Sequence, residues 1–465
     1  MADRSGSLQD FIDSTNLADY FYNDAVPAHA SKDRAFKGKP PVPAAFTNWR
    51  DEQMAAVQTA ALLHQSHHMP ELFIKGPDAI TLFKRIAVNT FENYGLDRGK
   101  QFIACTPSGH LIGDCILYRH GEESFELVSG APVLNWVEYQ AKTGGYDVEI
   151  ERDNAHNLNP TGRRTRYRFE LCGPNAREIF DRLVGSRDID IPFFRMRMVQ
   201  MGGHQVLALR HGMIGSFAVE LSGPFDEEED VRALILEAGK DLGIMPMGMD
   251  AYYSGLQAGW LPYPIPGIYT DPALTDYRKY LAATTFEGNA EIGGSFYSRN
   301  IEDYYATPYD YGYGNVIKFD HDFYGREALQ DIRDEEKRQK VTLVWNREDV
   351  LRVMGSQFGS GPRFKSIDLP NVSYAWAPYD EVRSAKGDLV GQSRHAAYQN
   401  PLGDILSLAL LQRDQAVIGS EVELVWGEPN GGSRKPQVER HEQTIIRARV
   451  AAAPYTADMQ MAKKV

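Results

Sequence analysis

Three histidines that lie close together are the first residues in the sequence that could do chemistry. His64, His67 and His68 fall within one short stretch, and an imidazole ring can bind a metal ion, transfer a proton or hold a hydrogen bond. His64 and His68 have the i, i+4 spacing of a helical metal site, but the extended apolar run from Leu72 to Lys75 follows closely, which opposes a helix there. A metal site, a structural pair and an acid/base or hydrogen-bonding group therefore all stay open.

Aromatic residues gather at two other places. Tyr252, Tyr253, Trp260 and Tyr263 form one cluster, and the tyrosines between positions 304 and 313 form the other. Such clusters often belong to a core or an interface, but they also supply flat apolar walls with polar tips for a planar ligand. Without a family, the residues are consistent with an aromatic pocket, with or without a histidine.

Composition and motifs narrow the class of protein. The chain of 465 residues has a formal net charge of −13, and such an acidic chain repels the phosphates of nucleic acids. Its 3 cysteines have no paired spacing, which favours a reducing compartment and opposes a cysteine zinc site. The N-terminus has no apolar signal core, and no apolar run approaches the roughly 20 residues of a membrane span. We expect a cytoplasmic protein with no nucleic-acid or membrane partner.

The elements that must position these residues include a repeated strand-turn-helix unit. In residues 72–87 and again in residues 169–184, a strand ends at Gly-Pro and the next helix has apolar residues three and four positions apart. A looser third copy runs from Val219 through Gly223 and Pro224 to a helix around residues 231–238. These units predict α+β subdomains with helices on one face of each sheet.

The C-terminal third has a different pattern. The charged segment 331–340 is expected to be a linker, and short strands are expected at residues 341–345, 405–411, 421–426 and 445–451. Strands of this length, separated by Gly, Pro and Asn, predict a small β-barrel. We therefore expect one region over residues 1–335 and a barrel domain over residues 336–465.

The most specific motif spans residues 308–329. Its two parts read PYDYGYGNVIKFD and FYGREAL, and they resemble the patterns Pro-x-(Glu/Asp)-x-Gly-x-Gly and Phe-x-Gly-(Arg/Lys)-Glu-Ala-Leu of the aminomethyltransferase family, which includes the glycine-cleavage T-protein. Residues 209–221 and 248–260 are similar to the same family. The resemblance implies an α+β cloverleaf of three subdomains around a channel for tetrahydrofolate, with residues 1–335 as two intertwined folate-binding subdomains.

Further segments resemble one branch of that family, the bacterial tetrahydrofolate-dependent O-demethylases of vanillate and syringate. These segments are FTNWR at 46–50, QSHHM at 65–69, TGGY at 143–146, IGGSF at 292–296, NIEDYY at 300–305 and VWGE at 425–428. The resemblance implies transfer of an O-methyl group from a methoxylated aromatic acid to N5 of tetrahydrofolate, without a metal.

Two positions depart from the relatives. Glycine-cleavage members carry an acidic pair where this chain has Gly113 and Asp114, which puts aminomethyl chemistry in doubt. Vanillate-type relatives carry an arginine for the substrate carboxylate where this chain has Gly130. Glycine leaves space for a second methoxy group, so we expect syringate as the first substrate and vanillate as the second.

The expected roles follow from this chemistry. A phenolate leaves more easily if an acid protonates it, and two planar molecules must be held in line. We expect Tyr252 to be the acid, with His68 as its partner, and a carboxylate to match the donors of the pterin. The predicted site residues are Tyr252 and His68 for catalysis, Gln65, Tyr22, Trp260 and Gly130 for the aryl substrate, and Glu220, Trp260 and Tyr252 for the folate.

Two alternatives remain. The aromatic residues also suit a cationic amine or sulfonium substrate. A non-enzymatic folate-binding protein is the other possibility, but the relatives of that kind carry a Lys-Gly-Cys motif, and the corresponding stretch here, residues 321–325, has no cysteine.

Overall fold

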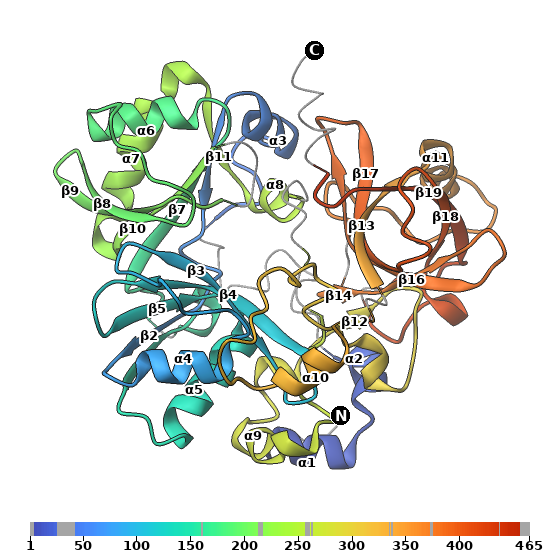
Figure 1. Ribbon diagram of the computed structural model, residues 1–465. Coiled ribbons are helices and arrows are strands. Elements are labelled where there is room, and N and C mark those ends of the chain that lie inside the picture. The colour runs from blue at the N-terminus through green and yellow to red at the C-terminus, as the bar shows by residue number, and fades with distance from the viewer. Residues whose placement is uncertain are drawn as a thin grey trace.

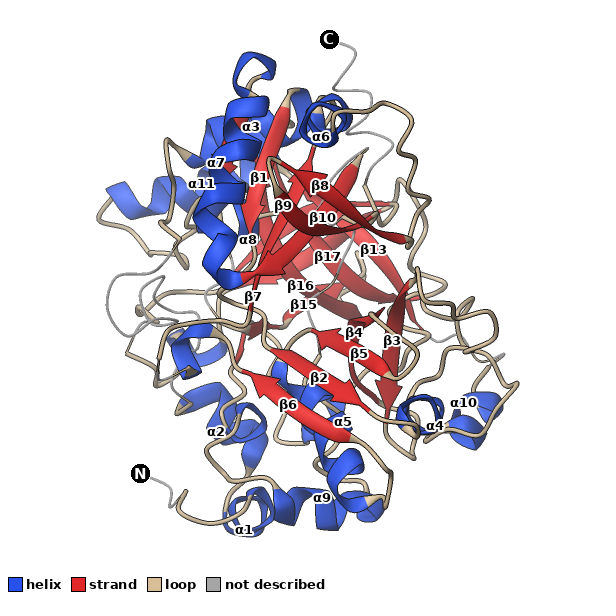
Figure 2. Ribbon diagram, turned by 90° about the vertical axis from the view of Figure 1, so that its left-hand side faces the viewer, coloured by secondary structure: helices blue, strands red, loops and turns tan. Residues whose placement is uncertain are grey.

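The computed structural model describes residues 4–25, 42–159, 161–212, 217–255, 261, 264–333, 335, 338–372, 375–436 and 438–455. Two open sheets and a closed barrel form three lobes around the middle of the molecule (Figure 1). Most strands lie toward the inside, and helices lie around them (Figure 2). The predicted α+β class with a C-terminal barrel is confirmed.

The first lobe is a six-stranded sheet with the order β11-β1-β7-β10-β9-β8. Its strands are β1 (Ala60–His64), β7 (Arg166–Cys172), β8 (Met196–Met201), β9 (His204–Leu209), β10 (Ala218–Pro224) and β11 (Ile244–Met247). Its helices are α3 (Trp49–Gln58), α6 (Ala176–Val184), α7 (Glu228–Ala238) and α8 (Met249–Tyr253). The apolar side chains of β7 and β10 pack with those of α6 and α7 into one core.

The second lobe is a five-stranded sheet with the order β3-β4-β5-β2-β6. Its strands are β2 (Glu71–Lys75), β3 (Gly99–Cys105), β4 (Leu111–Arg119), β5 (Ser124–Val128) and β6 (Glu149–Asp153), and its helices are α4 (Ala79–Ile86) and α5 (Ala131–Thr143). The strands β1 and β2 are neighbours in the chain but belong to different sheets. The short segment between them, residues 65–70, therefore connects the two lobes.

The repeated strand-turn-helix unit is confirmed, as β2–α4, β7–α6 and β10–α7. Gly76 and Gly173 close the first two strands with φ of 149° and 114°. A Cβ atom at Gly76 would stand 2.3 Å from the carbonyl oxygen of Asp147, and one at Gly173 would stand 2.8 Å from that of Thr59. Glycine is therefore needed both for the backbone conformation and for the close approach of a neighbouring chain.

The third lobe is a closed barrel with the order β13-β17-β16-β15-β18-β19. Its strands are β13 (Arg338–Trp345), β15 (Asp380–Arg383), β16 (Leu389–Gln399), β17 (Asp404–Gln412), β18 (Glu421–Trp426) and β19 (Thr444–Ala451). The predicted strands correspond to β13, β17, β18 and β19. The strands β15 and β16 were not expected, because their polar sequences do not show the alternation of a half-buried strand.

The prediction of a linker over residues 331–340 is wrong at its C-terminal end. The strand β13 starts at Arg338 and pairs with β17 from that residue onward. The guanidinium of Arg338 lies 2.6 Å from the carboxylate of Asp310, so its charge is compensated inside the fold. The charged segment was predicted to be a linker because a partner this distant in the sequence cannot be identified from the sequence alone.

The remaining elements surround these lobes. They are α1 (Leu8–Ser14), α2 (Leu17–Asn23), α9 (Thr275–Tyr280), α10 (Arg326–Asp331) and α11 (Arg347–Gly355), with the short strands β12 (Ile292–Gly293) and β14 (Ala377–Pro378). Because β12 pairs with β14, backbone hydrogen bonding crosses the expected domain boundary at residue 335. The division into residues 1–335 and 336–465 stays a prediction.

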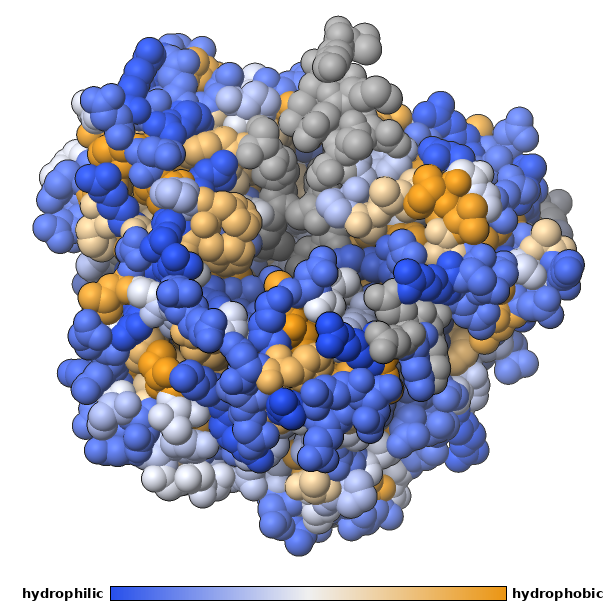
Figure 3. Space-filling model, viewed as in Figure 1, coloured by the Kyte–Doolittle hydropathy of each residue, from blue (hydrophilic) through white to orange (hydrophobic). Residues whose placement is uncertain are grey.

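The surface is mainly hydrophilic on the face that Figure 3 shows, with apolar residues in small patches. Among the described residues, no helix is both long and apolar enough to cross a membrane. Cys105, Cys115 and Cys172 are buried thiols without a disulfide.

Candidate functional site

The segment between the first two lobes carries Gln65. The backbone N–H of Gln65 donates to the carbonyl oxygen of Arg168 at 2.9 Å, so the chain continues the pairing of β1 with β7 for one residue. Its side chain is buried, and Nε2 donates to Oε2 of Glu170 at 3.1 Å. Gln65 also hydrogen-bonds to Tyr252, which connects this segment to α8.

Tyr252 and His68 form the predicted pair. The Tyr252 hydroxyl lies 3.0 Å from Nε2 of His68, and the two ring centroids are 5.0 Å apart. Burial raises the pKa of Tyr252 well above its usual value, and the nearby Tyr253, Glu170 and Glu220 raise it further. The phenol therefore keeps its proton at neutral pH and is available as a donor.

The short helix α8 is held in place by a residue of α3. Glu52 is buried, and its Oε2 accepts from the N–H of Gly248 at 2.8 Å, directly before α8. Its Oε1 accepts from the N–H groups of Phe46 and Thr47 at 2.7 and 2.9 Å. One carboxylate thus ties residues 46–47 to the start of α8, the helix that carries Tyr252.

Two carboxylates face each other at the centre of the six-stranded sheet. Glu220 on β10 stands directly opposite Glu170 on β7, and both are buried. Both also lie close enough to Tyr252 to raise its pKa. Oε2 of Glu220 accepts from the Tyr118 hydroxyl and lies 3.4 Å from Arg168, whereas its Oε1 is 4.0 Å from Nε2 of His211.

Glu170 was not predicted from the sequence. A signal for it exists, because β7 reads RYRFELC and all but its first residue are buried, although two of those buried residues are charged. A buried charge in a central strand needs a partner or a ligand. Sequence reasoning used this segment only as evidence for a repeated strand.

The other buried charge of β7 is Arg168, which holds the two open sheets together. Its guanidinium contacts Glu71 at 3.2 Å, Glu126 and Glu220. Burial raises the pKa of Glu71, and the neighbouring Glu126 carboxylate raises it further. Burial acts on Glu126 in the same direction, but Arg168 and a hydrogen bond from His120 outweigh it and lower the pKa of Glu126. The arginine charge therefore compensates a group of carboxylates from both lobes.

The motif at residues 308–329 lies beside Asp114. The Tyr313 hydroxyl donates to Oδ2 of Asp114 at 3.1 Å, and Gln101 donates to the same oxygen at 2.8 Å. Burial raises the pKa of Asp114. Asp114 is also the second residue of the Gly113-Asp114 pair, where this chain departs from the glycine-cleavage members. The motif at residues 308–329 therefore contacts the position of that departure.

The remaining predicted residues stand as follows. Gly130 precedes α5 with φ of −69°, a conformation that any residue adopts, so an arginine there is sterically allowed by the backbone. Tyr22 on α2 is buried, donates to the carbonyl oxygen of Gly294 at 2.6 Å and packs on Tyr297. Trp260 lies outside the described residues. The roles of Tyr22, Gly130 and Trp260 stay predictions.

Comparison with known proteins agrees with this architecture. Residues 16–258 match the model of the GCVT N-terminal domain. The chain is 41% identical over 453 residues to a syringate O-demethylase of Sphingobium sp., which covers 97% of this chain and 96% of that protein. It is 27% identical to a sesamin methylene transferase of Sinomonas sp., over 89% and 90% of the two chains. The chain belongs to the GCVT, or aminomethyltransferase, family.

The fold itself has a solved counterpart. The glycine cleavage aminomethyltransferase T of Bartonella henselae superimposes with a TM-score of 0.59 over 89% of this chain and 91% of that chain, at 16% sequence identity. The cloverleaf of the aminomethyltransferase type, expected from the sequence, is confirmed.

Proposed function

We propose that the protein is a tetrahydrofolate-dependent O-demethylase of a methoxylated aromatic acid, with syringate as the preferred substrate and vanillate as the second. The bond between the methyl carbon and the aryl oxygen breaks, and a bond from that carbon to N5 of tetrahydrofolate forms. The nitrogen loses one proton and the phenolate gains one, so the reaction is redox-neutral. The products are a phenol and 5-methyltetrahydrofolate.

The observation that carries the proposal is the hydrogen-bonded Tyr252–His68 pair, beside two buried carboxylates, in a chain 41% identical to a syringate O-demethylase. Tyr252 donates the proton to the leaving oxygen, and His68 relays a proton back to it. Burial in the same site also raises the pKa of the phenol that forms. The pKa values of the proton donor and of the leaving phenolate therefore stay close to each other.

Glu220 and Glu170 fit the pterin by their chemistry. The ring presents N–H and amino donors, and a carboxylate pair can accept them. Tyr118 and Arg168 hold Oε2 of Glu220 and so fix the direction of its carboxylate. Gln65 fixes Glu170 in the same way. We propose that these two carboxylates orient the folate, and that Gln65, Tyr22, Trp260 and Gly130 shape the aryl site.

The finer parts of the proposal concern cofactors and location. We propose that methyl transfer needs no metal ion, because an in-line displacement by an amine needs positioning and proton transfer. The partners are folate and a small aromatic acid, with no nucleic acid and no membrane. A cytoplasmic location agrees with three unpaired thiols.

A second candidate is supported by the same carboxylates. Two buried acids beside Tyr252 and Tyr253 also suit a cationic amine or sulfonium methyl donor. One panel separates the two: purified protein, tetrahydrofolate, and syringate, vanillate, a methylated amine or a sulfonium compound, with 5-methyltetrahydrofolate as readout. Product from syringate only when folate is present supports the first proposal. Product only from a cation would replace it, and equal turnover without folate would refute both.

A further inference from the structure

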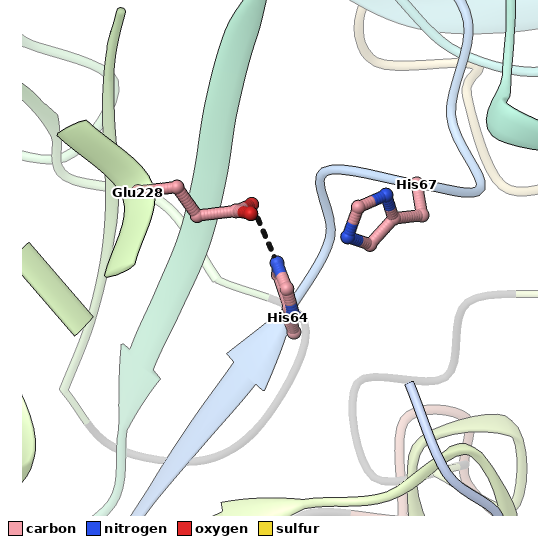
Figure 4. Close-up of side chains that lie close together, drawn as sticks. All are labelled: His64, His67 and Glu228. Atoms are coloured by element: carbon pink, nitrogen blue, oxygen red, sulfur yellow. Dashed lines mark hydrogen bonds and ion pairs between the residues drawn. The ribbon is translucent and has the colours of Figure 1, made fainter. Parts of the chain in front are cut away.

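A second group of side chains lies on the other side of the segment that carries Gln65. His64 ends β1, His67 follows in the same segment, and Glu228 begins α7 (Figure 4). Nε2 of His64 lies 2.7 Å from Oε1 of Glu228, and the rings of His64 and His67 are 4.6 Å apart. One ligand atom from each of the three residues lies within 4.8 Å of the other two.

A second histidine, His67, lies beside the His64–Glu228 pair. The residue is only 5% exposed. One ring nitrogen of His67 points toward His64 and Glu228 (Figure 4), so this ring can add a third ligand atom to the pair. The rings of His156 and Phe225 also lie close to it, with centroids 5.0 and 6.1 Å away.

From this geometry we propose that His64, His67 and Glu228 bind one zinc ion. Two imidazole nitrogens and one carboxylate oxygen are a zinc ligand set, whereas magnesium and calcium prefer oxygen ligands alone. Ligands about 2.0–2.2 Å from a tetrahedral zinc ion lie about 3.4 Å apart. The His64 and Glu228 atoms are 2.7 Å apart and all three ligand atoms lie within 4.8 Å of one another, so small side-chain rotations can bring them to this spacing.

The neighbours support the ligands. Ser66 hydrogen-bonds to the Glu228 carboxylate, which is the kind of outer contact that orients a metal ligand. Arg164 is close enough to His67 to act on it electrostatically, and its charge is compensated by Asp153 at 3.0 Å and Glu71 at 3.7 Å. One carboxylate and two neutral imidazoles leave a net positive charge on the zinc centre, and a fourth position for water or a solute anion.

The role of this ion is structural. It joins the end of β1, the segment between the two lobes and the start of α7, so its effect should appear as stability of the fold. The ion takes no part in methyl transfer, because its ligands come from the opposite side of that segment.

The test is a zinc titration of the full-length protein after removal of metals with a chelator. Calorimetry should give one zinc ion per chain, and elemental analysis after dialysis should retain it. Cobalt in place of zinc should give visible absorption typical of nitrogen and oxygen ligands. The thermal midpoint should rise with zinc, because a ligand that binds only the folded state stabilises it.

Variants locate the site. His67→Gln and Glu228→Gln should each lose stoichiometric binding. His204→Gln is the matched control, because His204 makes a similar single pair with Glu227, at 3.0 Å, just before α7 and lacks a second histidine; it should bind as the wild type does. Wild-type protein that takes up no zinc overturns the proposal and leaves a plain His64–Glu228 ion pair. Undiminished binding by His67→Gln also overturns it. Neither readout depends on turnover, so the result is independent of the proposed methyl transfer.

Discussion

His67 and His68 are adjacent in the sequence, yet their side chains enter different surroundings. The ring of His68 makes a hydrogen bond to Tyr252, beside Glu170 and Glu220. The ring of His67 packs against His64 and His156, and burial, with the neighbouring His64, lowers its pKa to about 3. One histidine therefore contacts the proposed proton donor, whereas the other is a buried ring that is neutral at physiological pH.

The segment that joins the two sheets therefore contributes side chains to two separate clusters. Because the backbone turns at residues 66–68, consecutive side chains leave it in different directions. Substitutions of neighbouring residues on this segment should therefore have separable effects, and the following experiments measure that separation.

The largest effect is expected for Tyr252→Phe. This change keeps the ring and deletes the hydroxyl that we propose as the proton donor, so turnover should fall by roughly 10²- to 10⁴-fold, the usual span for a general acid. Steady-state kinetics with syringate and tetrahydrofolate measure it, and affinities for both should change little. Tyr253→Phe is the control and should keep near-wild-type turnover. If turnover of Tyr252→Phe falls only a few fold, Tyr252 is a packing residue and not the proton donor.

His68 and His67 give the direct comparison. His68→Gln removes the relay to Tyr252, and turnover should fall by about 10²-fold, the lower end for acid/base groups. His67→Gln should leave turnover at saturating substrate near the wild-type level while it abolishes zinc uptake. Both variants are assayed for rate and for bound metal. Equal losses of turnover in the two variants would mean that the segment acts as one unit, against the separation described above.

The folate side is tested with Glu220→Gln. The change is nearly isosteric, so the fold should survive, but a charge-assisted hydrogen bond to the pterin is weakened, at a cost of about 1.5–3 kcal/mol in folate binding. Calorimetry of tetrahydrofolate binding measures the loss. Glu228→Gln, a carboxylate of the other cluster, is the control and should bind folate normally. Unchanged folate affinity in Glu220→Gln would remove Glu220 from the folate site.

The last change concerns the proposed substrate end of the methyl-transfer site, where the effect is on selectivity between two acids. Gly130→Arg should fill the space for a second methoxy group and add a partner for the carboxylate of the smaller ring, each worth about 1–3 kcal/mol. The wild type should prefer syringate over vanillate in kcat/KM, and the variant should reverse that order. Competition assays with both acids decide it. A wild type that already prefers vanillate, or an unchanged ratio in the variant, would show that position 130 does not face the ring.

Much of the fold could be predicted because its signals are local. The Gly-Pro turns, the helices that follow them and four of the barrel strands depend on residues close together in the chain. The motif at residues 308–329 also indicates the family from its sequence alone. In contrast, β15, β16 and the start of β13 were missed, because their stability comes from pairing with distant strands.

The sequence by itself determined which residue types were present for the chemistry: an acid, a histidine, a carboxylate and an amide, in motifs typical of the family. Only the tertiary structure decided which of them meet. Glu170 joins the proposed site because antiparallel pairing places it opposite Glu220, at a separation of 50 positions that no periodicity reveals. The separation of His67 from His68 was decided in the same way, since the direction of a side chain depends on a turn between two sheets and on the partners that each sheet brings to it.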